Sequence, residues 1–143
     1  MKRERELQRL VHFFTTISPA SLPGLGDIYA AGARFKDPFN DVYGLPAIAA
    51  IFAHMFRQVD APRFVVTGTV LQEEQAFLTW EFRFRMKRFS REEHCIEGGT
   101  HVLFDADGKV SVHRDYWDAA EELYEKLPVL GSLMRWLKRA ARR

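Results

Sequence analysis

Cysteine is almost absent from this sequence: Cys95 is the single thiol among 143 residues. One thiol excludes a disulfide within the chain and any cysteine-rich metal site, and it fits a reducing compartment, so we expect a cytoplasmic protein. The charged start, MKREREL, is followed by no long apolar run, which argues against a signal peptide. The longest weakly polar run, residues 47–56, is interrupted by His54 and is too short to span a membrane.

Strong net charge and the common ligand-binding motifs are missing as well. The formal net charge is only +2, which argues against a nucleic-acid partner. The histidines show no metal-ligand spacing such as HExxH, and the short Gly24-Leu-Gly26 stretch lacks the other glycine and the preceding strand of a phosphate loop. No Gly-x-Ser-x-Gly nucleophile elbow occurs. We therefore expect no metal and no cofactor.

Aromatic and apolar residues are plentiful. Hydrophobic residues make up 47% of the chain, and it contains twelve Phe, four Tyr and three Trp. This composition is too apolar for a disordered chain, and the length predicts one domain. So many rings favour a fold that encloses something.

The first part of the chain predicts helices. Apolar residues at helical spacing predict an amphipathic helix over residues 4–16, and a short helix is expected to begin with Ser21 as its N-cap and to reach Tyr29. Residues 33–39 predict an extended segment that ends at Pro38, residues 40–44 a loop, and residues 45–57 a further helix.

The second part predicts a curled antiparallel meander. Strands are expected over residues 63–71, 75–87 and 93–104, and a hairpin turn at Asp107-Gly108 leads into a last strand. In the strand over 75–87 the aromatic residues from Phe77 to Phe84 are expected on one face, with one shift of register. Strict alternation in the last strand places Val110, Val112, Arg114 and Tyr116 on one face, and Ser111, His113, Asp115 and Trp117 on the other. Helices followed by a meander predict an α+β fold.

Taken together, the segment 29–39 (YAAGARFKDPF), the helix after Gly44, and a meander ending in DADGKV and HRDYWD resemble the nuclear-transport-factor-2-like superfamily, and within it the SnoaL-like, ketosteroid isomerase-related branch. The resemblance implies a cone-shaped α+β barrel, in which a strongly curved mixed or antiparallel sheet wraps around N-terminal helices and leaves a pocket at one end. The cone domain is expected over residues 1–118, with a C-terminal helical extension over 119–143 packed on it. Members of the superfamily include isomerases, cyclases, hydrolases and non-catalytic binders, so the fold alone does not fix the function.

Asp37, Asp115 and His113 are the candidate catalytic residues. Asp37 stands in a Phe-Lys-Asp-Pro-Phe segment similar to that of the isomerase base, and the alternative is that it holds the pre-proline turn. Asp115 is the stronger candidate because the resemblance implies an acidic residue with acid/base work on the last strand, and His113 lies beside it on the same face. The alternative is a buried hydrogen-bonded pair that closes the cone. An arginine such as Arg34 or Arg83 is considered as a third member of an Asp–Arg–Asp set.

Steroid isomerisation itself is not expected. The resemblance places Phe13 and Thr100 where the isomerases have the tyrosine and the protonated aspartic acid that bind the enolate oxygen. Phe13 has no donor and Thr100 is a weaker one, and each lost oxyanion donor costs about 3 kcal/mol of transition-state stabilisation. The expected ligand-binding residues share an apolar or hydroxyl side chain and an inward position: Tyr29, Phe13, Phe52, Phe56, Trp80, Phe82, Thr100, Val102 and Trp117.

Three hypotheses follow for the function. In the first, a hydrophobic pocket binds a polycyclic or lipid-like small molecule and performs cofactor-free acid/base chemistry. In the second, the same fold is a non-catalytic module that binds a ligand or a protein, and in the third it is a structural dimer with a filled cone. The resemblance also implies a homodimer through the sheet face. The basic, amphipathic last helix is expected to cap the pocket or to pack on a second subunit, with contact to a membrane surface as the alternative.

Overall fold

The computed structural model describes residues 2–87, 92–118, 121, 136 and 139–141 of the chain. The expected helical extension over residues 119–143 lies almost wholly outside these described residues, and so do the hypotheses about what its helix covers. In the described part of the chain, no helix is long and apolar enough to cross a membrane.

Three helical segments precede or interrupt the strands. Helix α1 spans Glu4–Thr15, the 3-10 helix η1 spans Pro19–Asp27, and α2 spans Leu45–Gln58. The predicted N-cap of the second segment is wrong by one turn, because Ser18 is the N-cap and Ser21 lies three residues inside the helix. There the Ser21 hydroxyl accepts a hydrogen bond from the Ser18 amide at 3.0 Å, so the serine closes the turn from within.

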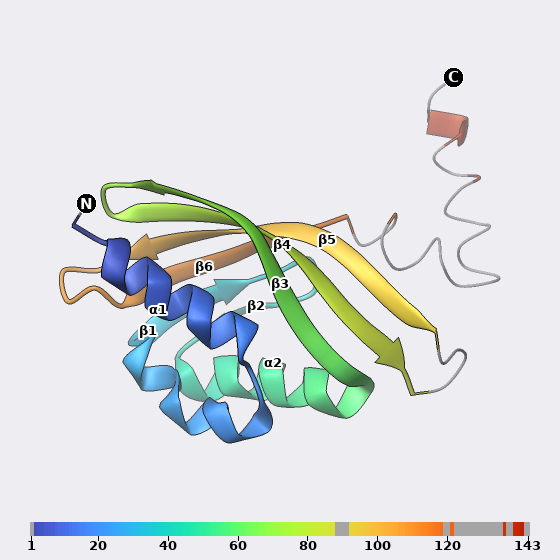
Figure 1. Ribbon diagram of the computed structural model, residues 1–143, viewed down its shortest axis with the longest axis horizontal. Coiled ribbons are helices and arrows are strands. Elements are labelled where there is room, and N and C mark those ends of the chain that lie inside the picture. The colour runs from blue at the N-terminus through green and yellow to red at the C-terminus, as the bar shows by residue number, and fades with distance from the viewer. Residues whose placement is uncertain (1, 88–91, 119–120, 122–135, 137–138, 142–143) are drawn as a thin grey trace.

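One six-stranded sheet bends over these helices (Figure 1). Its strands are β1 (Tyr29–Lys36), β2 (Asp41–Tyr43), β3 (Val59–Gln72), β4 (Gln75–Met86), β5 (Glu93–Phe104) and β6 (Val110–Tyr116). Their order across the sheet is β2-β1-β6-β5-β4-β3, and only β1 and β6 run parallel. The expected α+β fold with a curved mixed sheet and an antiparallel meander is confirmed. The short strand β2 falls within the stretch that was expected to be a loop.

The core lies between the concave face of the sheet and the helices. Apolar side chains from α1, η1, α2 and the strands form one buried cluster that includes Leu10, Tyr29, Ile48, Leu78 and Val102, each no more than 1% exposed. A second cluster of Trp80, Phe84 and Ile96 continues it along β4 and β5. Burying such side chains contributes about 1.5–3 kcal/mol each to the free energy of folding, so these two clusters stabilise the packing of the sheet on the helices.

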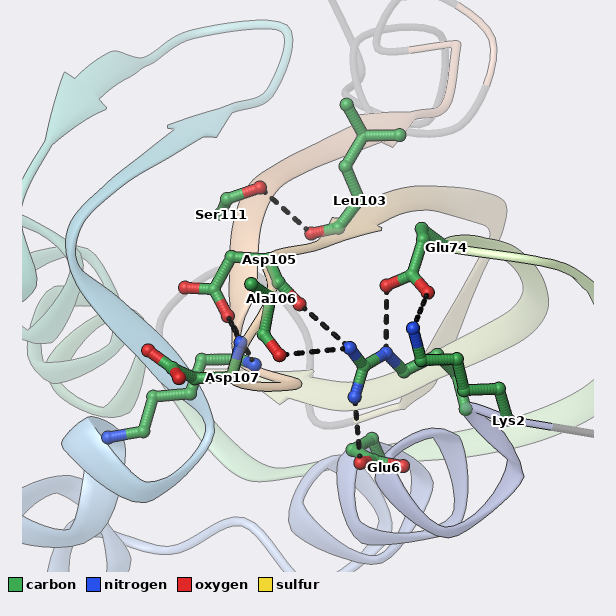
Figure 2. Close-up of polar contacts among 10 residues, drawn as sticks. Lys2, Glu6, Glu74, Leu103, Asp105, Ala106, Asp107 and Ser111 are labelled. Atoms are coloured by element: carbon green, nitrogen blue, oxygen red, sulfur yellow. Dashed lines mark hydrogen bonds and ion pairs between the residues drawn. The ribbon is translucent and has the colours of Figure 1, made fainter.

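A bulge corrects the predicted faces of β6. The β5–β6 pairing shifts between Leu103 and Phe104, and the Ser111 hydroxyl donates to the Leu103 carbonyl there at 3.2 Å (Figure 2). The extra residue turns Val110 into the core, where it is 1% exposed, instead of onto the face of Arg114. His113 and Asp115 keep the inward direction that the alternation predicted.

The aromatic alternation of β4 was also predicted with a shift that does not exist. The β4–β5 register is continuous, and Leu78 rather than Phe77 points into the core. Phe77 lies on the outer face, 38% exposed, where it covers Gly99: a Cβ added there would come within 2.6 Å of the Phe77 ring.

Arg3 fastens the start of α1 to two turns of the sheet. Its guanidinium, in a side chain only 7% exposed, donates to Glu6 and Glu74 and to the carbonyls of Asp105 and Ala106 at 2.8–3.2 Å (Figure 2). Hydrogen bonding to Arg3 holds the pKa of Glu74 below its usual value. Five donors in a planar fork suit this arrangement, so a lysine would not replace the arginine.

Candidate functional site

Five side chains form one hydrogen-bonded chain across the concave face of the sheet. The Tyr29 hydroxyl meets His113 Nδ1 at 2.8 Å, and His113 Nε2 meets Asp115 Oδ1 at 2.7 Å. Thr100 Oγ1 donates to the same Oδ1 at 2.6 Å, and Trp80 Nε1 donates to Thr100 Oγ1 at 2.8 Å. The residues come from β1, β6, β5 and β4, which are neighbours in the sheet, so the strand order itself sets the chain.

The donors of this chain all point toward Asp115. The Tyr29 hydroxyl is completely buried, and its one partner among the described residues is His113 Nδ1, which must therefore accept its proton. The imidazole is then neutral with its proton on Nε2, which donates to Asp115. The Thr100 hydroxyl donates its proton to Asp115 as well, and its oxygen accepts the hydrogen bond from Trp80. Two donors thus converge on Oδ1.

Burial keeps the far end of the chain protonated. Loss of water around Tyr29 raises the pKa of its hydroxyl well above the usual value, and the charge of Asp115 raises it further. The hydroxyl is therefore a donor throughout the physiological range. It fixes the tautomer of His113, whose ring is also stacked on Phe35 at 4.3 Å and contacts Phe14 edge-on.

Asp115 lies at the polar end of a small cavity of about 20 Å³. A volume of this size holds about one water molecule or one group of similar size. Thr100 and His113 lie beside Asp115, and the other described walls are aromatic or aliphatic; the described lining consists of Phe14, Phe52, Phe64, Val66, Leu78, Trp80, Thr100, His113 and Asp115. A carboxylate facing rings in a confined space can accept a proton or bind a donor group.

Asp115 also reaches the surface, because its side chain is 18% exposed. It takes part in lining a shallow depression at the ends of β1 and β6, together with Lys36, Asp37, Pro38, Arg114, Tyr116, Trp117 and Asp118. The carboxylate therefore lines both the cavity and the surface depression.

The structure places Asp37 outside the cavity and in a turn. Its Oδ1 accepts from the amides of Phe39 and Asn40, both at 2.8 Å, and from the side-chain amide of Asn40 at 3.1 Å. This is the pre-proline turn that the sequence offered as the alternative to catalysis. Asp37 shares the surface depression with Asp115, but its carboxylate already holds the loop together.

Neither candidate arginine reaches the cavity. Arg34 makes a two-pronged ion pair with Asp41 at 2.7 and 2.9 Å on the outer side of the sheet, and Arg83 binds Glu81 at 2.8 Å. The Asp–Arg–Asp arrangement is therefore not assembled in the described part of the chain. In the same part, no three His, Cys, Asp or Glu side chains come together as a metal ion would require.

The expected ligand-binding residues divide into three groups. Phe52, Trp80 and Thr100 line the cavity. Phe13, Tyr29, Val102, Phe56 and Phe82 pack in or against the two core clusters, where Phe82 stacks on Phe64 at 4.7 Å. Trp117 lines the surface depression, with its ring edge-on to Phe39 at 5.6 Å.

Four cavity residues were missed: Phe14, Phe64, Val66 and Leu78. The sequence prediction placed Phe77, and not Leu78, on the inner face of β4. It also placed Phe13, and not its neighbour Phe14, at the inward position of the first helix. Period-two alternation of Phe64 and Val66 on β3 was the signal that could have identified both.

Comparison with known proteins identifies the class to which this fold belongs. The model of the SnoaL-like domain family matches residues 10–113, about three quarters of the chain, and ends two residues before Asp115. No curated protein sequence matches the chain.

Solved structures agree on the fold. A protein called TsrD from Streptomyces laurentii superposes with a TM-score of 0.72 at 17% identity, over 86% of this chain and 95% of that one. A hypothetical protein with a ketosteroid isomerase-like fold from Catenulispora acidiphila, in complex with trimethylamine, gives 0.71 at 13% identity over 84% and 90%. A candidate SnoaL-like polyketide cyclase from Jannaschia sp. gives 0.70 at 15% identity over 81% and 87%. The chain belongs to the SnoaL-like domain family.

Proposed function

We propose that the chain binds a small hydrophobic molecule at the cavity and that Asp115 is its reactive group. Asp115 Oδ2 accepts or returns a proton, while His113 and Thr100 hold Oδ1 and so fix the direction of Oδ2. The observation that carries the proposal is the convergence of two buried donors on one carboxylate at the polar end of an aromatic cavity. Similar solved structures include a candidate polyketide cyclase and a candidate isomerase, and a positioned carboxylate can serve as the acid or base of such reactions.

Native mass spectrometry of the purified protein, followed by extraction of anything bound, tests this proposal. We expect a co-purified hydrophobic small molecule, or uptake of one from a mixture, in the wild type. Asp115→Asn is expected to fold, because an amide oxygen still accepts from Thr100 and His113, but to lose turnover of that molecule. A fully active Asp115→Asn variant would contradict the assignment of Asp115.

A second candidate function is non-catalytic binding at the same place. The small volume of the cavity favours non-catalytic binding. The five hydrogen-bonded side chains also donate all their protons to one another, so none of them is left to stabilise an oxyanion. In that case Asp115→Asn changes the affinity for the ligand, and the ligand is recovered unchanged from the wild type after prolonged incubation.

We also propose a homodimer through the outer face of the sheet. Apolar side chains are exposed there on several strands, among them Val65, Val70, Phe77 and Leu103. Light scattering after gel filtration tests this: Leu103→Lys is expected to halve the mass, whereas the control Gln8→Lys on α1 leaves it unchanged. A wild-type monomer at micromolar concentration would refute the dimer.

A further inference from the structure

One oxygen of the carboxylate at the polar end of the cavity accepts no hydrogen bond from the described residues. Trp80, Thr100, His113 and Tyr29 each direct their proton along the chain that ends at Asp115 Oδ1. No described residue donates to the second oxygen, Oδ2. The rest of the described lining is aromatic or aliphatic. The side chains of the cavity thus offer a ligand one acceptor and no donor.

From this inventory we infer that the cavity selects a cationic amine head group on a small hydrophobic molecule. The inference rests on the proposed function, because it names the ligand class of the same site. An ammonium group brings the donor and the charge that the carboxylate lacks, and a charge-assisted hydrogen bond is about twice as strong as a neutral one. Aromatic faces attract a cation further.

Ligand groups that can only accept hydrogen bonds do not fit this cavity, because its side chains offer them no donor. A ketone oxygen would face the Asp115 carboxylate with no proton between the two oxygens. A ligand carboxylate would in addition be repelled, because both groups are negatively charged. A neutral alcohol can donate to Oδ2, but it carries no charge and binds less tightly.

The size of the cavity decides which part of the ligand enters. A volume of about 20 Å³ takes one ammonium- or methyl-sized group, so the hydrophobic remainder lies toward the surface depression. That depression includes the carboxylates of Asp37, Asp115 and Asp118 against the cations of Lys36 and Arg114. Arg114 is held over the ring of Tyr116 at 4.6 Å, and carboxylates outnumber cations there, so a positive ligand is not repelled.

Three probes with the same branched chain test the inference: isopentylamine, isopentanol and 4-methylpentanoate. The reporter is the indole N–H signal of Trp80 in a proton–nitrogen NMR spectrum, because this proton is bonded to Thr100 next to the cavity. At neutral pH we expect isopentylamine to shift this signal with an affinity at least tenfold higher than that of isopentanol. We expect 4-methylpentanoate to leave the signal unchanged.

Variants locate the selectivity. Asp115→Asn is expected to remove the preference for the amine, whereas Asp118→Asn, which removes a charge from the surface depression only, keeps it. The wild-type series alone decides the inference if Asp115→Asn fails to fold. Equal affinities of amine and alcohol, binding of the carboxylate, or no shift with any probe would each overturn it. Binding of the alcohol without preference for charge would leave the proposed function intact, and the mass-spectrometric experiment tests that function separately.

Discussion

Replacing Thr100 by valine removes one hydroxyl from the middle of the polar chain while keeping the shape of the side chain. Thr100 is 2% exposed, accepts from Trp80 Nε1 at 2.8 Å and donates to Asp115 Oδ1 at 2.6 Å. Thr100→Val therefore leaves a buried indole N–H without an acceptor and Asp115 with one donor fewer. The adjacent cavity has space for about one water molecule, which can replace these two hydrogen bonds only in part.

The size of the effect follows from these two losses. A hydrogen bond to a charged group contributes about 1.5–3 kcal/mol, and an unsatisfied buried donor costs about 1–3 kcal/mol. Since the two losses share one water-sized space, they do not add fully, and we expect the free energy of unfolding to fall by about 2–5 kcal/mol. Domains are stable by only about 5–15 kcal/mol, so this is a large fraction.

Urea unfolding followed by tryptophan fluorescence measures the change. The matched control is Thr79→Val on the outer face of the neighbouring strand, where the hydroxyl bonds the exposed Thr67 at 2.8 Å and no other described residue. We expect the control to stay within about 0.5 kcal/mol of the wild type, as exposed substitutions do. A Thr100→Val variant within the same margin would refute the polar chain as described.

The remaining predictions concern packing and the Arg3 contacts. Gly98→Ala places a Cβ 2.6 Å from the Trp80 ring and should cost about 1–3 kcal/mol in chemical denaturation, whereas Gly32→Ala, with nothing within 4 Å, should change stability by less than about 1 kcal/mol. Equal effects would contradict the packing of Trp80. Arg3→Met should lower the melting temperature at neutral pH. Because the pKa of Glu74 is lower in the folded chain than in the unfolded chain, its stabilisation is present above the unfolded pKa and is lost as pH falls through the folded pKa. The difference in melting temperature between Arg3→Met and the wild type should therefore shrink in acid, and a constant difference would exclude a contribution from this charge.

Much of the fold was predictable because it depends on local patterns. Alternation in the second half of the chain and the Asp107-Gly108 turn predicted the meander, and Gly108 indeed has a φ of 80°. The inward direction of His113 and Asp115 followed from the same alternation. The face of Val110 was not predictable, because a bulge is fixed by the pairing of two strands and not by either sequence alone.

The site was predictable only in part. Asp115, His113 and Thr100 were each singled out, but the sequence gives no distance between them. Tyr29 was assigned to ligand contact, whereas the structure shows its hydroxyl bonded to His113. That contact depends on β1 lying parallel to β6, a pairing between segments about 80 residues apart. The width of the cavity depends on how rings from α1, α2, β3 and β4 interlock, which no periodicity describes.

The tautomer of His113 tests the central claim most directly, because the convergence of donors on Asp115 requires it. A long-range proton–nitrogen NMR spectrum of the imidazole, assigned with His113→Gln, distinguishes the two ring nitrogens. We predict a neutral ring with the proton on Nε2 and an unprotonated Nδ1, with loss of this preference in Tyr29→Phe. A proton on Nδ1 with a bare Nε2 would reverse the bond to Asp115 and contradict the account.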